Sequence, residues 1–130
     1  MNAVDTRTKI LGLDAARAAA RREHENGRRV RLVTGFFDPV LAAHARALSE
    51  AALDGAAVYV AVADPERPLL AARARAELVA GLKAVTGVVL AGAAAAESAI
   101  EPDDVVQQQA ADTRRTRELI EHVQSRQDGK

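Results

Sequence analysis

One run of five apolar residues constrains the fold of this chain more than any other feature of the sequence: Val58-Tyr59-Val60-Ala61-Val62. An unbroken apolar run of this length is typical of a strand that is buried on both faces. Shorter segments rich in valine and leucine at Val30–Thr34 and Val85–Leu90 predict two further strands. Strands buried on both faces occur in parallel sheets that carry helices on either side, so we expect an α/β protein.

Helix-forming segments alternate with these strands. The Ala- and Arg-rich run Ala15–Glu25 is expected to begin after Asp14 as N-cap and to end at Gly27. Two more helices are predicted over about 41–53, ending at Gly55, and over about 69–84. Their apolar stripes at helical spacing are Leu41, Ala45, Leu48 and Ala52 in the first, and Leu70, Ala74, Leu78 and Leu82 in the second.

The remaining segments are less regular. Residues 1–12 are interpreted as a loosely ordered lead-in, and residues 91–104 are ambiguous. Val105–Gln108 is a candidate for a fourth strand. A last helix over Thr113–Ser125, capped by Asp112, is predicted from one apolar stripe at helical spacing: Thr116, Leu119, Ile120 and Val123.

The order of these elements predicts a parallel sheet with right-handed crossovers. The chain has 130 residues, enough for one domain over residues 1–130. We therefore expect a single three-layer, Rossmann-like α/β domain with a short parallel sheet. Within it, Val30–Thr34 should lie centrally, and Gly35 should begin the loop at its carboxyl end.

Composition narrows the classes of function. Basic and acidic residues are equally numerous, which argues against nucleic acid as a partner, because such binding relies on neutralising phosphates. The chain has no cysteine, and the histidines at 24, 44 and 122 are too far apart in sequence to indicate a metal site. No apolar run could span a membrane and no signal-peptide core is visible, so we expect no membrane partner and a cytoplasmic location.

Aromatic residues are scarce, with two Phe, one Tyr and no Trp. The core must therefore be built from Ala, Val and Leu, which bury little area per residue. Small cores often gain buried apolar area by association, so the sequence predicts a homodimer. The stripe of Leu119, Ile120 and Val123 is the candidate interface, unless it covers the sheet instead.

The sequence also indicates where a ligand would bind. In an open parallel sheet, ligands lie beyond the carboxyl ends of the strands. The first predicted strand ends at Thr34-Gly35, where glycine permits a sharp turn and a close approach of backbone N–H groups. The helix that follows offers its positive N-terminal end to an anion. The segment from Gly35 to His44 is therefore the expected phosphate site.

The segment Val33–His44 reads V-T-G-F-F-D-P-V-L-A-A-H, and it resembles the signature of the cytidylyltransferase-like nucleotidylyltransferases. In that family a strand is followed by G-x-F-D-x-x-H-x-G-H. The nearest types are the heptose-phosphate adenylyltransferases and the glycerol-3-phosphate cytidylyltransferases. The resemblance covers about residues 28–90. Its further matches are Arg46, Leu48, Arg75–Leu82, Val85 and Val88-Val89.

The resemblance implies a transfer of a nucleotidyl group from ATP or CTP, with Mg²⁺, to a small phosphorylated sugar or alcohol, releasing pyrophosphate. No covalent intermediate is needed, so catalysis would depend on positioning and charge stabilisation. His44 is the catalytic candidate, because the motif histidines of this family hold triphosphate oxygens. The residues implied for binding nucleotide or phosphate are Thr34, Gly35, Phe36, Phe37, Asp38, His44 and Arg75.

Four family features are missing. Leu41 stands where the first motif histidine is expected, and Ala43 where the motif glycine is expected. The loop at 63–68 is short and has no lysine, and nothing after Leu90 matches I-S-S/T-T-x-x-R. The resemblance therefore implies a nucleotidylyltransferase-like protein with an eroded triphosphate site that is non-catalytic or binds nucleotide weakly. An active nucleotidylyltransferase and an unrelated α/β binding module remain alternatives, so enzymatic activity stays open.

The candidate residues also have structural interpretations. Asp38-Pro39 is favoured as the N-cap and first residue of a helix, and Phe36 and Phe37 as packing residues. His44 is either a phosphate ligand or a partly buried helix residue bonded to a carbonyl. Surface ion pairs or solvated charges are expected for Arg28, Arg29, Arg31, Arg75 and Glu77. Arg67 is a minor candidate to replace the missing lysine.

Overall fold

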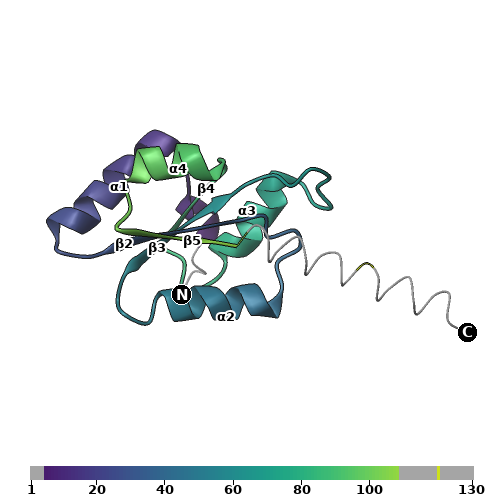
Figure 1. Ribbon diagram of the computed structural model, residues 1–130, viewed down its shortest axis with the longest axis horizontal. Coiled ribbons are helices and arrows are strands. Elements are labelled where there is room, and N and C mark those ends of the chain that lie inside the picture. Colours follow the sequence, from purple (N-terminus) through teal and green to yellow (C-terminus); the bar gives the residue numbers. More distant parts are fainter. Residues whose placement is uncertain (1–4, 109–119, 121–130) are drawn as a thin grey trace, which may run out of the picture.

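The computed structural model describes residues 5–108 and residue 120. Five strands form one sheet in the order β1-β4-β3-β2-β5, and all neighbouring strands are parallel. Figure 1 shows helices on both faces of this sheet. The protein therefore has the expected three-layer, Rossmann-like α/β fold. The strands are β1 (Ile10–Leu11), β2 (Val30–Gly35), β3 (Ala57–Val62), β4 (Gly87–Val89) and β5 (Asp104–Gln107).

Within the part of the chain that the structure describes, two helices cover each face. Helices α1 (Leu13–Glu25) and α4 (Ala93–Ile100) lie together on one face, and helices α2 (Ala42–Ala51) and α3 (Ala72–Ala80) pack on the other (Figure 1). A short 3-10 helix, η1 (Thr6–Lys9), precedes β1. Buried alanines of α1 and α4 allow both helices to approach the sheet closely, which suits a core poor in aromatic residues.

The position of β2 in the sheet matters most for function. Strand β2 pairs with β3 on one side and with β5 on the other, so the prediction that Val30–Thr34 lies inside the sheet is confirmed. From β2 the chain builds outward to β3 and β4, and then returns to add β5 on the opposite side of β2. The strand order reverses between β2 and β5, and open α/β sheets bind their ligands at such a switch point.

Most of the predicted elements are present with shifted ends. Helix α1 ends at Glu25, and Gly27, two residues later, has a φ of +76°, the left-handed conformation expected just after a helix. The predicted N-cap of this helix was wrong. Gly12 has the extended backbone of the N-cap, and Asp14 lies within the first turn. The candidate strand at Val105–Gln108 is confirmed as β5.

Two elements were missed. Strand β1 lies in the segment interpreted as a loosely ordered lead-in, and its two residues are too few to show a period. Helix α4 lies in the ambiguous segment 91–104, where the sequence A-A-A-A-E-S-A-I offers little contrast between its faces. The helix predicted over Thr113–Ser125 falls outside the described residues.

The predicted orientation of α3 was also wrong. Leu78 is 53% exposed and Ala74 is exposed, so the middle of the proposed apolar stripe faces away from the sheet, whereas Leu82 packs against the core. The buried residues of this helix are Arg75, Ala76, Val79 and Ala80. Small residues face the sheet because the helix lies close to it, and the side chain of Arg75 extends toward the ends of β2 and β3. None of the helices in the described residues is long and apolar enough to cross a membrane.

Candidate functional site

The candidate site lies where β2, β3 and β5 end. Gly35, the last residue of β2, pairs with Val62 of β3, and its carbonyl accepts the Ala63 N–H at 2.9 Å. Thr34 is fully buried, and its carbonyl accepts the Gln108 N–H at 2.8 Å. Gly35 still belongs to β2, so the loop begins one residue later than the sequence predicted, at the switch point of the sheet.

The aromatic residues of this loop pack more than they present a surface. Phe37 is fully buried, and its φ of 51° turns the chain sharply after β2. The Phe37 ring lies 5.0 Å from the His44 ring, centroid to centroid. Phe36 is half-buried, and its carbonyl accepts a hydrogen bond from Arg75. The packing role expected for Phe37 is thus present in the structure.

His44 is held by the helix that carries it. The side chain is 1% exposed, and its Nδ1 accepts the Leu41 N–H at 2.8 Å. The His44 N–H in turn donates to the Leu41 carbonyl at 2.9 Å. Leu41 is the N-cap of α2, so the imidazole satisfies a backbone N–H at the start of the helix, as the glutamate of a capping box does. Because Nδ1 accepts, the neutral ring carries its proton on Nε2.

Asp38 ties the β2–α2 loop to the next loop. Its side chain is 3% exposed, and its two oxygens accept the backbone N–H groups of Leu69 and Leu70. The Asp38-Pro39 bond is cis, and α2 begins only at Ala42. The expectation that Asp38-Pro39 caps this helix was therefore wrong. The carboxylate serves a segment thirty-one residues further along the chain, and local sequence gives no sign of this.

Arg75 is a buried clamp and not a surface residue. Its guanidinium is fully buried and donates to the carbonyls of Phe36 at 2.9 Å, Ala63 at 2.8 Å and Leu70 at 3.1 Å. Its Nη2 also bonds to the carboxylate of Asp64. These partners come from the β2–α2 loop, the end of β3 and the loop before α3, so one side chain joins three segments.

The surface ion pairing expected for Arg75 was wrong, because its side chain is buried. The surface ion pairing expected for Glu77 is present, since its carboxylate lies 3.5 Å from the guanidinium of Arg73, one helical turn away. Arg75 is brought together with the other predicted site residues, but its donors point to oxygens of the chain itself. Arg75 lies on the buried side of α3. The apolar pattern of the sequence assigned the opposite side of this helix to the core, so the burial of Arg75 was not predicted.

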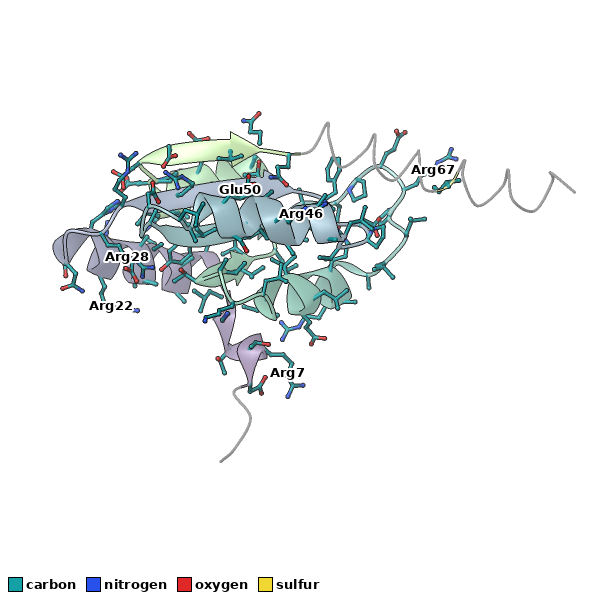
Figure 2. All side chains as sticks on the ribbon, turned by 90° about the horizontal axis from the view of Figure 1, so that it is seen from below. Arg7, Arg22, Arg28, Arg46, Glu50 and Arg67 are labelled. Carbon is teal, nitrogen blue, oxygen red and sulfur yellow. The ribbon has the colours of Figure 1, made fainter. Side chains whose placement is uncertain are left out.

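The β3–α3 loop, residues 63–71, is pinned by the two buried charges. Asp38 accepts the N–H of Leu70, and Arg75 donates to the carbonyl of the same residue. Arg67 lies exposed on this loop, at the opposite end of the molecule from Arg28 (Figure 2). The short loop is therefore fixed against the carboxyl ends of β2 and β3.

A second cluster of arginines lies at the amino end of β2. Arg31 was expected to be solvated, but its side chain is only 13% exposed and bonds to both Asp54 and Asp104. The Arg31 guanidinium lowers the pKa of Asp54 to about 2. Arg28 donates to the Gly55 carbonyl at 2.9 Å. These contacts join β2, β5 and the turn after α2, so their role is structural.

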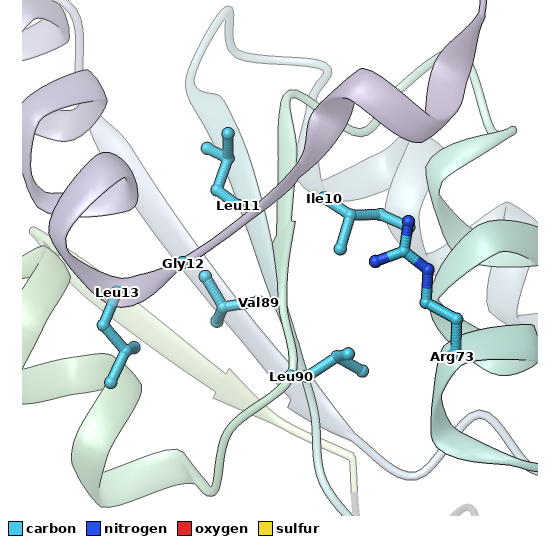
Figure 3. A pocket seen from close by; sticks show the side chains of 7 residues that line it. All are labelled: Ile10, Leu11, Gly12, Leu13, Arg73, Val89 and Leu90. Carbon is cyan, nitrogen blue, oxygen red and sulfur yellow. The ribbon is translucent and has the colours of Figure 1, made fainter.

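A separate cavity of about 280 Å³ opens beside β1, β4 and the start of α1, as Figure 3 shows. Its lining is mostly aliphatic, with Arg73 as its charged residue. The sequence did not reveal this cavity, because β1 was not predicted. The cavity is lined by Ile10, Leu11, Gly12, Leu13, Arg73, Val89 and Leu90.

Neither the known protein families nor the curated proteins include a match to this chain. The resemblance to the nucleotidylyltransferases therefore rests on the residues of the motif.

Proposed function

We propose that this chain is a nucleotidylyltransferase-like protein that binds a nucleoside triphosphate weakly at the carboxyl end of β2 and does not turn it over. The proposed site lies at the switch point of the sheet, and the N-terminus of α2 follows it directly. The spacing from Gly35 to His44 is that of the family motif, which favours descent from a nucleotide-binding protein.

One observation carries the proposal: Arg75, the buried cation beside the motif loop, already bonds to four oxygens of the chain. Because the guanidinium is fully buried, a phosphate could reach it only if one of these partners moved aside. His44 likewise uses its Nδ1 on the Leu41 N–H. The polar groups closest to the expected triphosphate position thus stabilise the loops around it.

The side chains at two motif positions also disfavour the binding of a triphosphate. Leu41 offers an isobutyl group where the family places a hydrogen-bond donor, and desolvating a phosphate oxygen without a partner is unfavourable. Ala43 adds a methyl group where the family places glycine. Each lost donor in such a site typically costs about 3–4 kcal/mol of transition-state stabilisation.

The proposal predicts no release of pyrophosphate above background when the protein is incubated with Mg²⁺, ATP or CTP, and phosphorylated sugars or alcohols. Release should be followed by a coupled assay, with enzyme-free mixtures as the control. Turnover by the wild type would establish the alternative, an active nucleotidylyltransferase with an unusual site.

Restoring the motif should restore affinity. The double replacement Leu41→His with Ala43→Gly is expected to tighten triphosphate binding by about 1–3 kcal/mol, because each restored contact is a charge-assisted hydrogen bond or a closer backbone approach. Calorimetric titration measures the change. The matched control is Ala52→Gly with Leu53→His, which makes the same changes beside the exposed turn after α2. Equal affinities of the two double variants would contradict the placement of the site.

A further inference from the structure

We propose that Asp64 occupies an oxyanion site on Arg75 from within the chain, and that releasing Asp64 opens this site to a phosphoryl group. The inference rests on the proposed function, since it concerns the same end of the sheet. It adds an occupant and a means of regulation that the motif does not imply.

The two partners differ sharply in exposure. The Arg75 side chain is fully buried, whereas the Asp64 side chain is 67% exposed. The carboxylate of Asp64 is therefore the solvent-exposed partner of a buried guanidinium. Among the described residues, Asp64 is the only acidic side chain bonded to Arg75, and the other partners are neutral carbonyls.

A buried guanidinium needs a counter-charge as well as hydrogen bonds, because neutral carbonyls cannot replace the hydration of a cation. Carboxylate and phosphoryl oxygens offer arginine the same kind of acceptor. An external phosphoryl oxyanion could thus take the place of Asp64 while the three carbonyl bonds stay intact. The expected ligand is therefore a phosphoryl group, because one of its oxyanions would replace the Asp64 carboxylate.

Asp64 could leave Arg75 while the rest of the β3–α3 loop stays in place. Asp64 is two residues beyond the end of β3, and the later part of the same loop is held separately, by bonds from Leu69 and Leu70 to Asp38. The Arg75 Nη1 also donates to the Phe36 carbonyl, so the opened site would adjoin the motif loop. Displacement of one exposed side chain would therefore join the Arg75 site to the proposed nucleotide site.

The test is Asp64→Ala, titrated with inorganic phosphate and with ATP and compared with the wild type. Glu66→Ala is the matched control, because it removes an exposed carboxylate from the same loop. We expect Asp64→Ala to bind both ligands about ten-fold more tightly than the wild type, and Glu66→Ala to leave affinity unchanged. An unchanged Asp64→Ala, or an equal gain in Glu66→Ala, would overturn the inference.

Stability provides a second readout if Asp64→Ala is poorly folded without ligand. Asp64→Asn keeps an oxygen for Arg75 but removes the charge, and its melting temperature should rise with added phosphate more than that of the wild type. No greater rise would also overturn the inference. Because inorganic phosphate alone reports on Arg75, failure here combined with a gain in Leu41→His with Ala43→Gly would leave the proposed function standing.

Discussion

Arg75 stabilises the site through bonds that only its own side-chain shape can make. Its Nε and both Nη groups reach three carbonyls and one carboxylate in different directions. The ammonium group of lysine cannot span these positions. We expect Arg75→Lys to destabilise the fold by about 1–3 kcal/mol in urea unfolding, because buried carbonyls lose their donors. Arg73→Lys, an exposed change on the same helix, should stay within about 0.5 kcal/mol, and equal losses would contradict the clamp.

Asp54 gives the protein an acid-sensitive contact. Its bonds with Arg31 lower its pKa from 3.8 to about 2 in the folded chain. A depressed pKa stabilises the fold above the unfolded value and ceases to do so as the pH falls through the folded value. The stability difference between wild type and Asp54→Asn should therefore be constant above about pH 5 and shrink between pH 4 and 2. Unfolding with urea at each pH measures it, and parallel curves through this range would exclude the coupling.

Asp103, just before β5, is a second carboxylate whose pKa is lowered in the folded chain. Its Oδ2 accepts the Val30 N–H at 2.7 Å and lies 3.0 Å from the Nε2 of His24. The bond from Val30 is the main reason that the pKa of Asp103 is lowered, and the bond from His24 adds to it. This carboxylate links α1, β2 and β5 at the end of the sheet opposite the candidate site.

Among the contacts between elements, Gly87 of β4 lies directly against the Tyr59 ring of β3. A Cβ added to Gly87 would lie 2.9 Å from the Tyr59 ring and 3.3 Å from Leu11. We expect Gly87→Ala to cost about 1–3 kcal/mol, because the ring is buried and has little room to shift. Gly92→Ala meets no atom within 4 Å and should cost less than about 1 kcal/mol. A smaller loss for Gly87→Ala than for Gly92→Ala would show that the strands adjust freely.

The sequence predicted the elements whose residues carry their own pattern. Strand β3 is an unbroken apolar run and β2 is rich in β-branched and apolar residues, so both were recognised as strands before their partners were known. Strand β1 was not predicted, because its two residues form a strand only by pairing with β4. The wrong face of α3 was predicted to be buried because the leucines in and beside it dominated the apolar pattern, whereas the close approach of the helix to the sheet buries Ala76, Val79 and Ala80.

The sequence predicted the position of the candidate site but not the hydrogen bonds within it. A glycine after a buried strand located the loop, since topology alone puts ligands there. The roles of Asp38 and Arg75 depend on contacts with residues 31 and 39 positions away in the chain. No local pattern encodes such contacts, which is why a capping role and a surface ion pair were expected instead.

At the scale of the whole molecule, we propose that the chain forms a homodimer. Several large apolar side chains are exposed on the described surface, among them Leu53 at 82% and Leu69 at 54%. Association would bury some of this area and support an aromatic-poor core. Light scattering should give twice the chain mass of 13.7 kDa. A mass of one chain throughout the micromolar range would reject the dimer.

At the ligand end of the sheet, the polar groups of His44 and Arg75 are bonded to the chain itself. Calorimetric titration of the wild type with ATP and Mg²⁺ tests this most directly, since it needs no knowledge of the acceptor. The contacts of His44 and Arg75 predict weak binding, with a Kd of about 1 mM or higher, near 4 kcal/mol of binding free energy or less. A Kd of about 1 μM would mean that these groups bind triphosphate readily, and it would contradict the account.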